Sequence, residues 1–403
     1  MKLTEVFTRE SEGAVSLVGV VEMTAPRETV EVYFKYPDRF RDCVADNADP
    51  FVPALLVPCL MAGEDLEIAP PISARLLRSL VPIQDIYTAW WRGTMTRVEV
   101  KATAREAAPA PPSRGTGLFF SLGVDSFYSL LKDMRRLPSV APPVTHLIFM
   151  RGLETPIEAV KGDELVEKRI AEVSAESGKE LILGETNIRT VFPLDWSKFY
   201  HGAGLAAVAL SLSEGLGHVL IAGAYSYRDM QLVGGHPLLD PLWSTERLEI
   251  IHDGSELTRA HKIADLLARE PLALRNLRVC IANDAGDWNC GLCPKCIRTM
   301  ISFRLAGALD LVETLPNRLP EDIHLRLPLS PPSALIYLKE NIELGKETGL
   351  APELVGTLER ALRNHHRRAA VQTLLGDSRV GRSILFLADI RRGIRRWLRA
   401  KRP

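Results

Sequence analysis

The sequence lacks both a long hydrophobic run and an excess of one charge over its 403 residues. No apolar stretch reaches the length of a bilayer span, and residues 1–13 have no apolar core of the kind found in secretory signals. Lys plus Arg and Asp plus Glu both number 50, so the bulk charge does not indicate a nucleic-acid or membrane partner. We therefore expect a cytoplasmic protein without a transmembrane segment.

Cysteine is scarce, and its six positions are unevenly distributed. In a reducing compartment, cysteines serve as free thiols or metal ligands more often than as disulfides. Cys43 and Cys59 lie far apart and have no partner nearby in the sequence, so we expect both to pack in a core.

Residues 280–296 contain the other four cysteines, and the last three have CxxCxxC spacing. Gly291 and Pro294 suit the tight turns that such a loop needs. Because the protein would fill all four positions of a tetrahedron, we expect a structural Zn²⁺ and not one that activates water. An iron–sulfur cluster also uses four thiolates and stays open as an alternative. The predicted metal ligands are Cys280, Cys290, Cys293 and Cys296.

A stretch rich in proline and alanine, EAAPAPPSRG at residues 106–115, predicts a linker between folded units. Residues 1–105 before it predict a small α+β domain, because TVEVYFKY alternates as a half-buried strand does and other segments have helical spacing. Residues 116–309 alternate short apolar strands with helical segments, and residues 310–403 are predicted to form a helical C-terminal region.

The middle domain is predicted to be an α/β unit with a Rossmann-like parallel sheet covered by helices on both faces. Ligands of such sheets bind at the carboxyl ends of the strands. The loop that follows the first strand is therefore the first candidate for a binding site. The expected strands are residues 118–120, 145–150, 180–185, 218–225 and 277–280.

The last segment, ILFLADIRRGIRRWLRAKRP at residues 384–403, predicts a basic amphipathic helix. Such a helix can bind an acidic partner, RNA or an anionic membrane. The interpretation that we prefer is a terminal helix docked on its own protein or on the second copy of a homodimer, with its charges in water.

The loop SLGVDS, residues 121–126, joins the first predicted strand to a helix. Gly123 permits a backbone that exposes successive N–H groups, and the helix directs its free N–H groups and positive dipole end at the loop. Ser121 and Ser126 add hydroxyl donors, so the loop is suited to a phosphate chain. Asp125 has the wrong charge to contact phosphate, so it either caps the helix or holds Mg²⁺. No GKS or GKT is present, which excludes a Walker loop.

The SLGVDS loop resembles the SGGxDS loop of the PP-loop ATP pyrophosphatases. The resemblance implies an adenine nucleotide alpha hydrolase-like (HUP-type) fold, in which the loop grips the β,γ-pyrophosphate of ATP while a substrate attacks the α-phosphorus. It implies catalytic roles for Asp125 and Ser126. The sequence departs from the pattern at Leu122, where the motif has glycine. The leucine side chain can still point away from the phosphate, because the backbone N–H is the group that binds. The loop residues implied to bind ATP are Ser121, Leu122, Gly123, Val124, Asp125 and Ser126.

Together, the loop and the cysteine cluster resemble 7-cyano-7-deazaguanine synthases. Those enzymes adenylate a carboxylate, convert it with ammonia to an amide and then a nitrile, and bind zinc through four cysteines. ELTRAHKIADLLARE resembles the helix before the cysteines, with Lys262 matching the family's helical lysine and implied to be catalytic. The resemblance covers residues 115–305, and the rest of the chain has no counterpart in it.

The interval 225–254 departs from the family's substrate loop, so we expect a different acid or carbonyl substrate, either small or carried on a macromolecule. After the third strand, Asn187 and His201 are expected nucleotide contacts, although His201 also fits a capping or core role. Asp253 is interpreted as a helix cap. The candidate substrate contacts are Tyr227, His236, Asp240, Ser244, Thr245, His252 and Arg298.

The predicted function is that of an ATP-dependent ligase or synthetase that forms an adenylate, releases AMP and pyrophosphate, and lets ammonia, an amine or sulfur attack. A nucleotide-sensing or scaffold module without turnover is an alternative, and the departure at Leu122 favours it. A tRNA or sulfur-transfer PP-loop enzyme is a further alternative. Against it, only Cys43 and Cys59 would remain as persulfide carriers, and both lie in the N-terminal domain.

Overall fold

The structure is a computed structural model that describes residues 1–105, 114–154, 157, 163–280, 288–327, 329–330 and 332–375. Most of the predicted linker at residues 106–115 and the whole predicted basic helix at residues 384–403 lie outside the described residues. None of the described helices is both long and apolar enough to cross a membrane.

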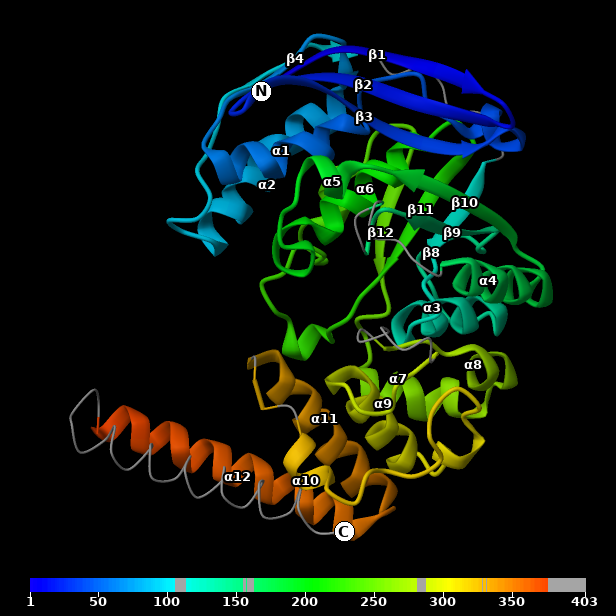
Figure 1. The fold of residues 1–403 in the computed structure, drawn as a ribbon, viewed down its shortest axis with the longest axis vertical. Coiled ribbons are helices and arrows are strands. Elements are labelled where there is room, and N and C mark those ends of the chain that lie inside the picture. Colours follow the sequence, from blue (N-terminus) through cyan, green and yellow to red (C-terminus); the bar gives the residue numbers. More distant parts are fainter. Residues whose placement is uncertain are drawn as a thin grey trace.

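One mixed sheet of ten strands runs through the described part of the chain in the order β12-β11-β8-β9-β10-β3-β2-β1-β4-β6 (Figure 1). Counted from β8, its parallel half has the order 5-4-1-2-3, which is that of doubly wound α/β sheets. The α/β class and the parallel sheet are therefore confirmed. The parallel strands are β8 (Gly115–Phe119), β9 (His146–Arg151), β10 (Glu180–Thr186), β11 (Leu216–Ala222) and β12 (Glu249–Asp253).

The fifth strand differs from the expected one. The prediction of a strand at residues 277–280 was wrong, because this segment leaves the preceding helix without strand pairing. The strand is instead β12, which lies inside the interval assigned to the substrate loop. Segments of four or five residues, such as LRVC and EIIHD, are too short for periodicity to separate a strand from a connecting segment, which explains the error.

The N-terminal strands continue the same sheet. Strand β3 pairs antiparallel with β10, with Lys35 opposite Glu185 and Phe34 opposite Thr186. The buried Tyr36 hydroxyl lies 2.6 Å from the Ser211 hydroxyl across this junction. These strands are β1 (Lys2–Ser11), β2 (Ala14–Thr24), β3 (Arg27–Pro37), β4 (Leu66–Ile68) and β6 (Val100–Lys101), with β5 (Ile72–Ser73) and β7 (Ala104–Arg105) in a separate small sheet.

Helices cover both faces of the parallel half, because alternate side chains of each strand point in opposite directions. Leu118 belongs to a core with α3 and α4, whereas its neighbour Phe119 belongs to the core with α1 and α6. The helices that pack on the sheet are α1 (Phe51–Ala62), α2 (Ala74–Trp90), α3 (Val124–Met134), α4 (Asp163–Ser177), α5 (Ile188–Val191) and α6 (His201–Ser211), and α8 (Pro271–Asn276) contacts α4.

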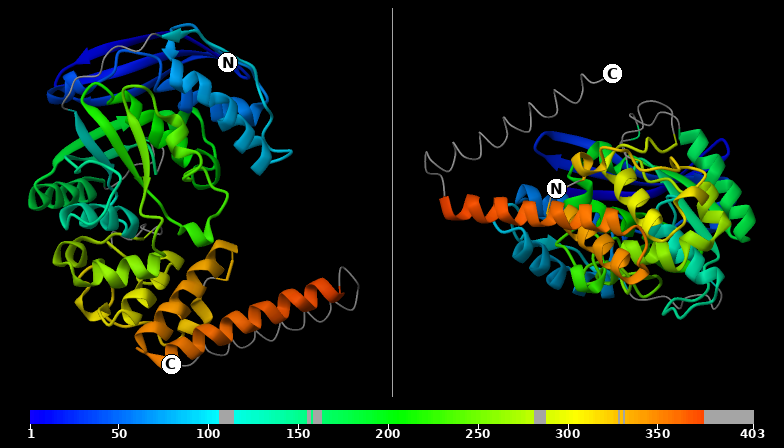
Figure 2. Two further views of the ribbon diagram at one scale, coloured as in Figure 1. Left: turned by 180° about the vertical axis from the view of Figure 1, so that it is seen from behind. Right: turned by 90° about the horizontal axis from the view of Figure 1, so that it is seen from below.

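A helical part lies beyond the carboxyl ends of the parallel strands, opposite the N-terminal strands (Figures 1 and 2). This part has a hydrophobic core of its own, the third in the molecule, which includes Ile301, Leu338 and Leu358. The last helix extends away from the body of the molecule (Figure 2). The helices of this part are α7 (Arg259–Asp265), α9 (Pro294–Leu305), α10 (Ile323–Arg326), α11 (Pro332–Thr348) and α12 (Pro352–Leu375).

The turn after β9 provides a test of this arrangement. Gly152 has φ +86°, and a Cβ added there would lie 1.9 Å from the Thr186 carbonyl oxygen at the end of β10. Gly152→Ala is expected to lower the free energy of unfolding by about 3 kcal/mol or more, measured by urea denaturation. Gly178→Ala is the control, since it has φ +67° but nothing within 4 Å, and should cost only about 1 kcal/mol. Equal effects of the two substitutions would contradict the close approach of β9 and β10.

Candidate functional site

The loop after β8 has a strained backbone at the position where the resembled motif has glycine. Leu122 has φ +63°, in the left-handed region that favours glycine. Its side chain is fully buried in the hydrophobic core with Phe120 and Val124. The leucine thus keeps the backbone conformation that glycine supports while its side chain points away from the loop. Strain of this kind, about 1–2 kcal/mol, is concentrated at functional sites in proteins.

The start of α3 carries no side-chain cap. Gly123 is the N-cap residue, and no side chain accepts a hydrogen bond from the first turn. The Ser126 hydroxyl braces the loop, because it donates to the Gly123 carbonyl at 3.2 Å and lies 3.4 Å from the Ser121 amide nitrogen. An uncapped helix start next to a braced loop is an arrangement suited to binding an anion.

Asp125 forms ion pairs with cations of α7 and does not cap α3. Arg259 donates to both carboxylate oxygens, and the Lys262 ammonium lies 3.2 Å from Oδ1. Burial alone would raise the pKa of Asp125, but the charges of Arg259 and Lys262 outweigh burial and hold this pKa well below its ordinary value. Lys262 also donates to the Gly223 carbonyl at 2.6 Å. Two of the three predicted catalytic residues, Asp125 and Lys262, therefore lie together.

Among the described residues around the loop, positively charged side chains outnumber negatively charged ones. The electrostatic neighbours of Lys295 are Glu154, Arg259, Arg298 and Asp125. Burial and the nearby charge of Arg259 lower the pKa of Arg298 to about 10. Such crowding of cations is unfavourable unless an anion completes the site.

Two buried guanidinium nitrogens without a hydrogen-bond partner among the described residues also indicate that the site is incomplete without an anion. The Nε atoms of Arg278 and Arg298 have no hydrogen-bond partner in the part of the chain that the structure describes. A buried donor left unpaired costs about 1–3 kcal/mol, so such groups in a native protein call for a ligand or another explanation.

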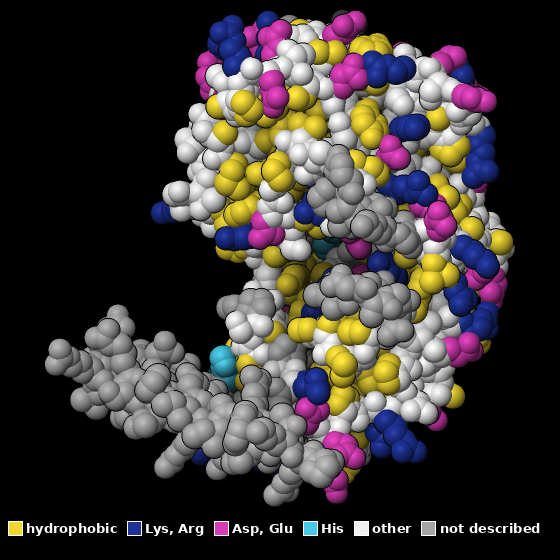
Figure 3. All heavy atoms as spheres, in the orientation of Figure 1, with side chains coloured by type: hydrophobic (Ala, Val, Ile, Leu, Met, Phe, Trp, Pro, Cys, Tyr) yellow, Lys and Arg dark blue, Asp and Glu magenta, His cyan; other side chains and the backbone are white. Residues whose placement is uncertain are grey.

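An aromatic side chain from α11, Tyr337, lies against Arg298 and Arg259. The Arg298 guanidinium carbon is 4.0 Å and that of Arg259 is 5.1 Å from the Tyr337 ring centroid. Tyr225, which follows β11, stacks on the same ring with 5.8 Å between centroids. Cation–π contacts stabilise both guanidinium groups next to the ring. The C-terminal helical region thus contributes directly to the site through Tyr337. The space-filling view shows a hollow on this face of the molecule, between its upper and lower parts (Figure 3).

One turn beyond Tyr337, Glu340 is buried on α11 with 1% of its surface exposed. Its Oε1 has no hydrogen-bond partner among the described residues. Burial raises the pKa of Glu340 to about 7, although the charge of Arg259 acts to lower it. Glu340 therefore titrates near neutral pH next to the cation cluster.

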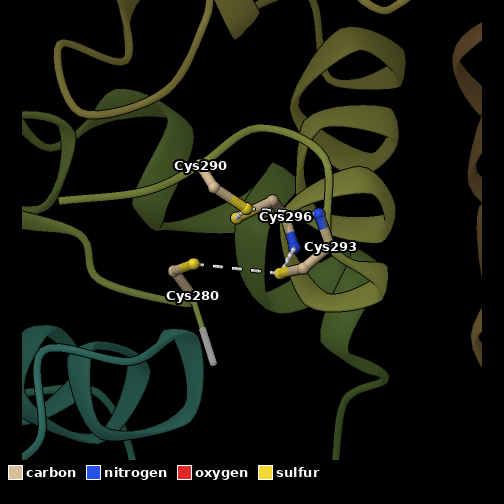
Figure 4. A group of neighbouring side chains, drawn as sticks. All are labelled: Cys280, Cys290, Cys293 and Cys296. Carbon is tan, nitrogen blue, oxygen red and sulfur yellow. Dashed lines mark hydrogen bonds between the residues drawn. The ribbon is translucent and has the colours of Figure 1, made fainter. Parts of the chain in front are cut away.

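The four cysteines converge as predicted (Figure 4). Their sulfur atoms all lie within 4.8 Å of one another, with Cys290 3.9 Å from Cys296 and Cys280 4.0 Å from Cys293. A tetrahedral ion with Zn–S bonds of about 2.3 Å requires sulfur separations of about 3.8 Å, so the donor set fits such a metal. The Cys293 amide also points at the Cys290 sulfur, at 3.3 Å. These four residues can hold a metal ion.

The cysteine cluster is joined directly to the loop after β8. Two residues before Cys280, the Arg278 amide donates to the Leu122 carbonyl at 2.9 Å. On the other side, Lys295 and Arg298 lie in the first turns of α9, which starts immediately after Cys293. A metal that fixes the cysteines would therefore fix three cations around the loop.

Three predicted substrate contacts form an internal hydrogen-bond chain. Asp240 Oδ2 lies 2.6 Å from His252 Nδ1, and His252 Nε2 lies 2.9 Å from the Ser255 hydroxyl. The other Asp240 oxygen accepts from the His236 amide at 3.2 Å. The Ser255 hydroxyl donates to the Tyr225 carbonyl at 2.8 Å, which connects this chain to the tyrosine stack. Asp240 and Ser255 are fully buried, so the chain positions the loop between β11 and β12.

The structure places other predicted residues away from the loop. Ser244 and Thr245 precede β12 at its amino end, where they are buried and accept from the Ile250 and Leu248 amides. Asn187 joins β10 to the N-terminal strands, since its side chain accepts from the Tyr33 amide at 3.0 Å.

Two further predicted residues lie on the same side as the loop. His201 starts α6, and burial lowers its pKa, although the charges of Asp240 and Asp125 act to raise it. Tyr227 follows β11 and is 62% exposed.

Asp253, interpreted as a helix cap, instead accepts from Lys132 at 2.5 Å, while Thr258 caps α7.

Sequence reasoning missed several site residues. Arg278 and Lys295 flank the cysteines in the sequence, and their positive charge beside a predicted metal site was a signal that could have found them. Arg259 lies in the segment ELTRAHKIADLLARE, in which only Lys262 was singled out. Tyr337 and Glu340 belong to no motif, and only the packing of α11 on α7 brings them to the loop.

Comparisons with known proteins add no relative. No protein-family model matches the chain, and searches of curated proteins and of solved structures found no match. The function of the chain is therefore inferred from the residues of the site.

Metal removal tests the link between the cysteines and the loop. Purified protein is expected to contain one Zn²⁺ per chain by elemental analysis, and Cys290→Ser is expected to lose most of it. Because Arg278, Lys295 and Arg298 depend on the cluster, the substitution should also weaken pyrophosphate binding about tenfold or more. The control is Cys43→Ser, which should leave both quantities unchanged. If the protein contains iron and absorbs visible light, the cysteines bind an iron–sulfur cluster and not zinc. Unchanged pyrophosphate binding after loss of the metal would contradict the link between the cysteines and the loop.

Glu340 gives a prediction for stability as a function of pH. Its pKa in the folded state, about 7, lies above the ordinary value of 4.5, so the folded state binds more protons between these values. The unfolding free energy should therefore fall as pH rises through this window, by about 3 kcal/mol in total. Glu340→Gln should remove this loss and be more stable than the wild type at pH 8 but not at pH 4.5, as measured by urea denaturation. Glu343→Gln is the control and should show no such gain, because the pair with Arg228 lowers the pKa of Glu343.

Proposed function

We propose that the protein is an ATP-dependent synthetase that adenylates a carboxylate or carbonyl substrate and releases AMP and pyrophosphate. The observation that carries this proposal is the excess of buried cations around an uncapped helix start. Arg278 and Arg298 each present a buried Nε without a hydrogen-bond partner in the described part of the site, next to a strained loop. A chain of phosphates would satisfy these donors and the N–H groups of the loop together.

The pyrophosphate end of ATP would bind residues 121–126, with Arg298 and Lys295 neutralising charge that grows on the leaving group. Asp125 is the carboxylate that would hold Mg²⁺, which supplies charge neutralisation between phosphate oxygens. The four cysteines would hold Zn²⁺ in a structural role, because they leave no coordination position open. Lys262, fixed between Asp125 and the Gly223 carbonyl, would keep the loop after β11 in register with the nucleotide.

The acceptor would bind on the side of the loops after β11 and β12. Exposed Tyr227 and the imidazole of His201 are the residues that would contact it, and the chain from Asp240 through His252 to Ser255 would hold those loops in place. We propose an acid or carbonyl compound as acceptor, free or on a larger molecule, and ammonia, an amine or sulfur as the attacking group. The resemblance to 7-cyano-7-deazaguanine synthase supports this chemistry. A cytoplasmic, homodimeric protein is part of the same proposal.

A nucleotide-sensing module without turnover is the second candidate. It is favoured by the ion pairs of Asp125, since both of its carboxylate oxygens are engaged by Arg259 and Lys262. In a sensor these pairs would persist when nucleotide binds, and Asp125 would take no metal.

Product analysis separates the two candidates. The protein is incubated with ATP labelled at the α- or γ-phosphorus, together with Mg²⁺, ammonium and an extract of small metabolites. Labelled AMP and pyrophosphate are expected from the wild type. Asp125→Asn should lower their formation by about 10²-fold or more, because it removes the charge that holds the metal.

The matched control is Asp310→Asn, at an exposed position, which should keep the wild-type rate. Thermal unfolding of each variant verifies that it is folded. ADP and phosphate as products would contradict adenylation, and binding of ATP without any cleavage would favour the sensing module.

A further inference from the structure

In the structure, Asp125 is not free to hold a metal. Its Oδ2 is bonded by Arg259, and its Oδ1 is shared by the same guanidinium at 3.4 Å and by Lys262 at 3.2 Å. Lys262 is anchored independently through the Gly223 carbonyl, so it stays in place if Arg259 leaves. If Arg259 moved away, Oδ2 of Asp125 would have no partner, and Oδ1 would still be bonded by Lys262. A metal site at Asp125 therefore requires another acceptor for Arg259.

Glu340 has the position and chemistry of that acceptor. The Arg259 guanidinium lies over the Tyr337 ring, and Glu340 follows Tyr337 by three residues on α11. Residues three apart share a helix face and are separated by about 4.5 Å along the axis. The carboxyl group is buried, its Oε1 has no hydrogen-bond partner in the described chain, and its charge acts on Arg259.

The charges around Glu340 leave Arg259 as its natural partner. The largest charge effects on the Glu340 carboxyl group come from Arg259, Asp229 and Asp125, and of these only Arg259 is positive, while the Ala260 amide donates to the same carboxyl group. Asp229 is paired with Arg228, which in turn binds Glu343 on the exposed side of α11. No described cation is bonded to Oε1 of Glu340.

We propose that Arg259 exchanges partners, moving from Asp125 to Glu340 when a metal–nucleotide complex binds. Glu340 is thus a positioning residue that acts through Arg259, and the ring of Tyr337 is the surface along which the guanidinium moves. The inference rests on the proposed nucleotide site and extends it, because the C-terminal helix α11 becomes part of metal binding. Arg298 keeps its contact with Tyr337 and remains available to phosphate.

The exchange makes binding with metal different from binding without it. A nucleotide alone leaves Asp125 paired with Arg259, whereas the metal complex must displace that pair. Removal of the Glu340 charge should therefore weaken only the binding that includes Mg²⁺. The expected loss is about ten- to a hundredfold, the range for a buried charged group that loses its hydrogen-bond partner.

The experiment is a double-mutant cycle on nucleotide affinity. Titration calorimetry measures the Kd of α,β-methylene-ATP, with Mg²⁺ and with EDTA, for the wild type, Glu340→Gln, Arg259→Gln and the double variant. Glu340→Gln is expected to raise the Kd with Mg²⁺ at least tenfold and to leave the Kd in EDTA unchanged. In the Arg259→Gln background, Glu340→Gln should not change the Kd with Mg²⁺ further, because no guanidinium group then needs an acceptor.

The control is Glu343→Gln, one turn along α11, which removes only an exposed pair with Arg228 and should not change either Kd. Thermal unfolding verifies that each variant is folded. An unchanged Kd in Glu340→Gln would overturn the exchange, and so would an equal loss in both backgrounds. If the wild type binds no nucleotide with or without Mg²⁺, the proposed function fails as well, which distinguishes that failure from loss of the exchange alone.

Discussion

The site depends on the hydrogen bond from the Arg278 amide to the Leu122 carbonyl, which joins the cysteine cluster to the loop after β8. Leu122 lies in a backbone conformation that costs a non-glycine residue about 1–2 kcal/mol, so the loop needs support from its surroundings. The segment that supplies this support ends at Cys280. A metal bound by the four sulfurs would therefore hold the loop in shape from outside the sheet.

The same cluster also sets the charge of the site. Helix α9 starts after Cys293 and carries Lys295 and Arg298 towards the loop, while α11 covers the guanidinium groups with Tyr337. Parallel strands bring the ends of β8, β11 and β12 to one edge, and the helical part closes over that edge. The result is a group of hydrogen-bond donors and cations around a loop whose one carboxylate, Asp125, is already paired, an arrangement that suits the proposed binding of an anion.

Local patterns could be predicted from the sequence, and contacts made by packing could not. The spacing of Cys290, Cys293 and Cys296 and the change from strand to helix at SLGVDS are encoded within a few residues. The strand β12 was missed because EIIHD is short and surrounded by polar residues. Arg259 and Glu340 are far apart in the sequence, and neither has a motif that indicates that α11 packs on α7. Ser244 and Thr245 have the chemistry of a site, but the direction of β12 places them at its other end.

The most direct test is a crystal structure of the protein with Mg²⁺ and α,β-methylene-ATP, an analogue that cannot be cleaved between its α- and β-phosphorus atoms. The account predicts the β- and γ-phosphates at the amides of residues 121–126, Arg298 within hydrogen-bond distance of phosphate, and Mg²⁺ bound to Asp125. Arg259 would then lie beside Glu340. Nucleotide bound elsewhere, or an empty loop at saturating analogue, would contradict the account.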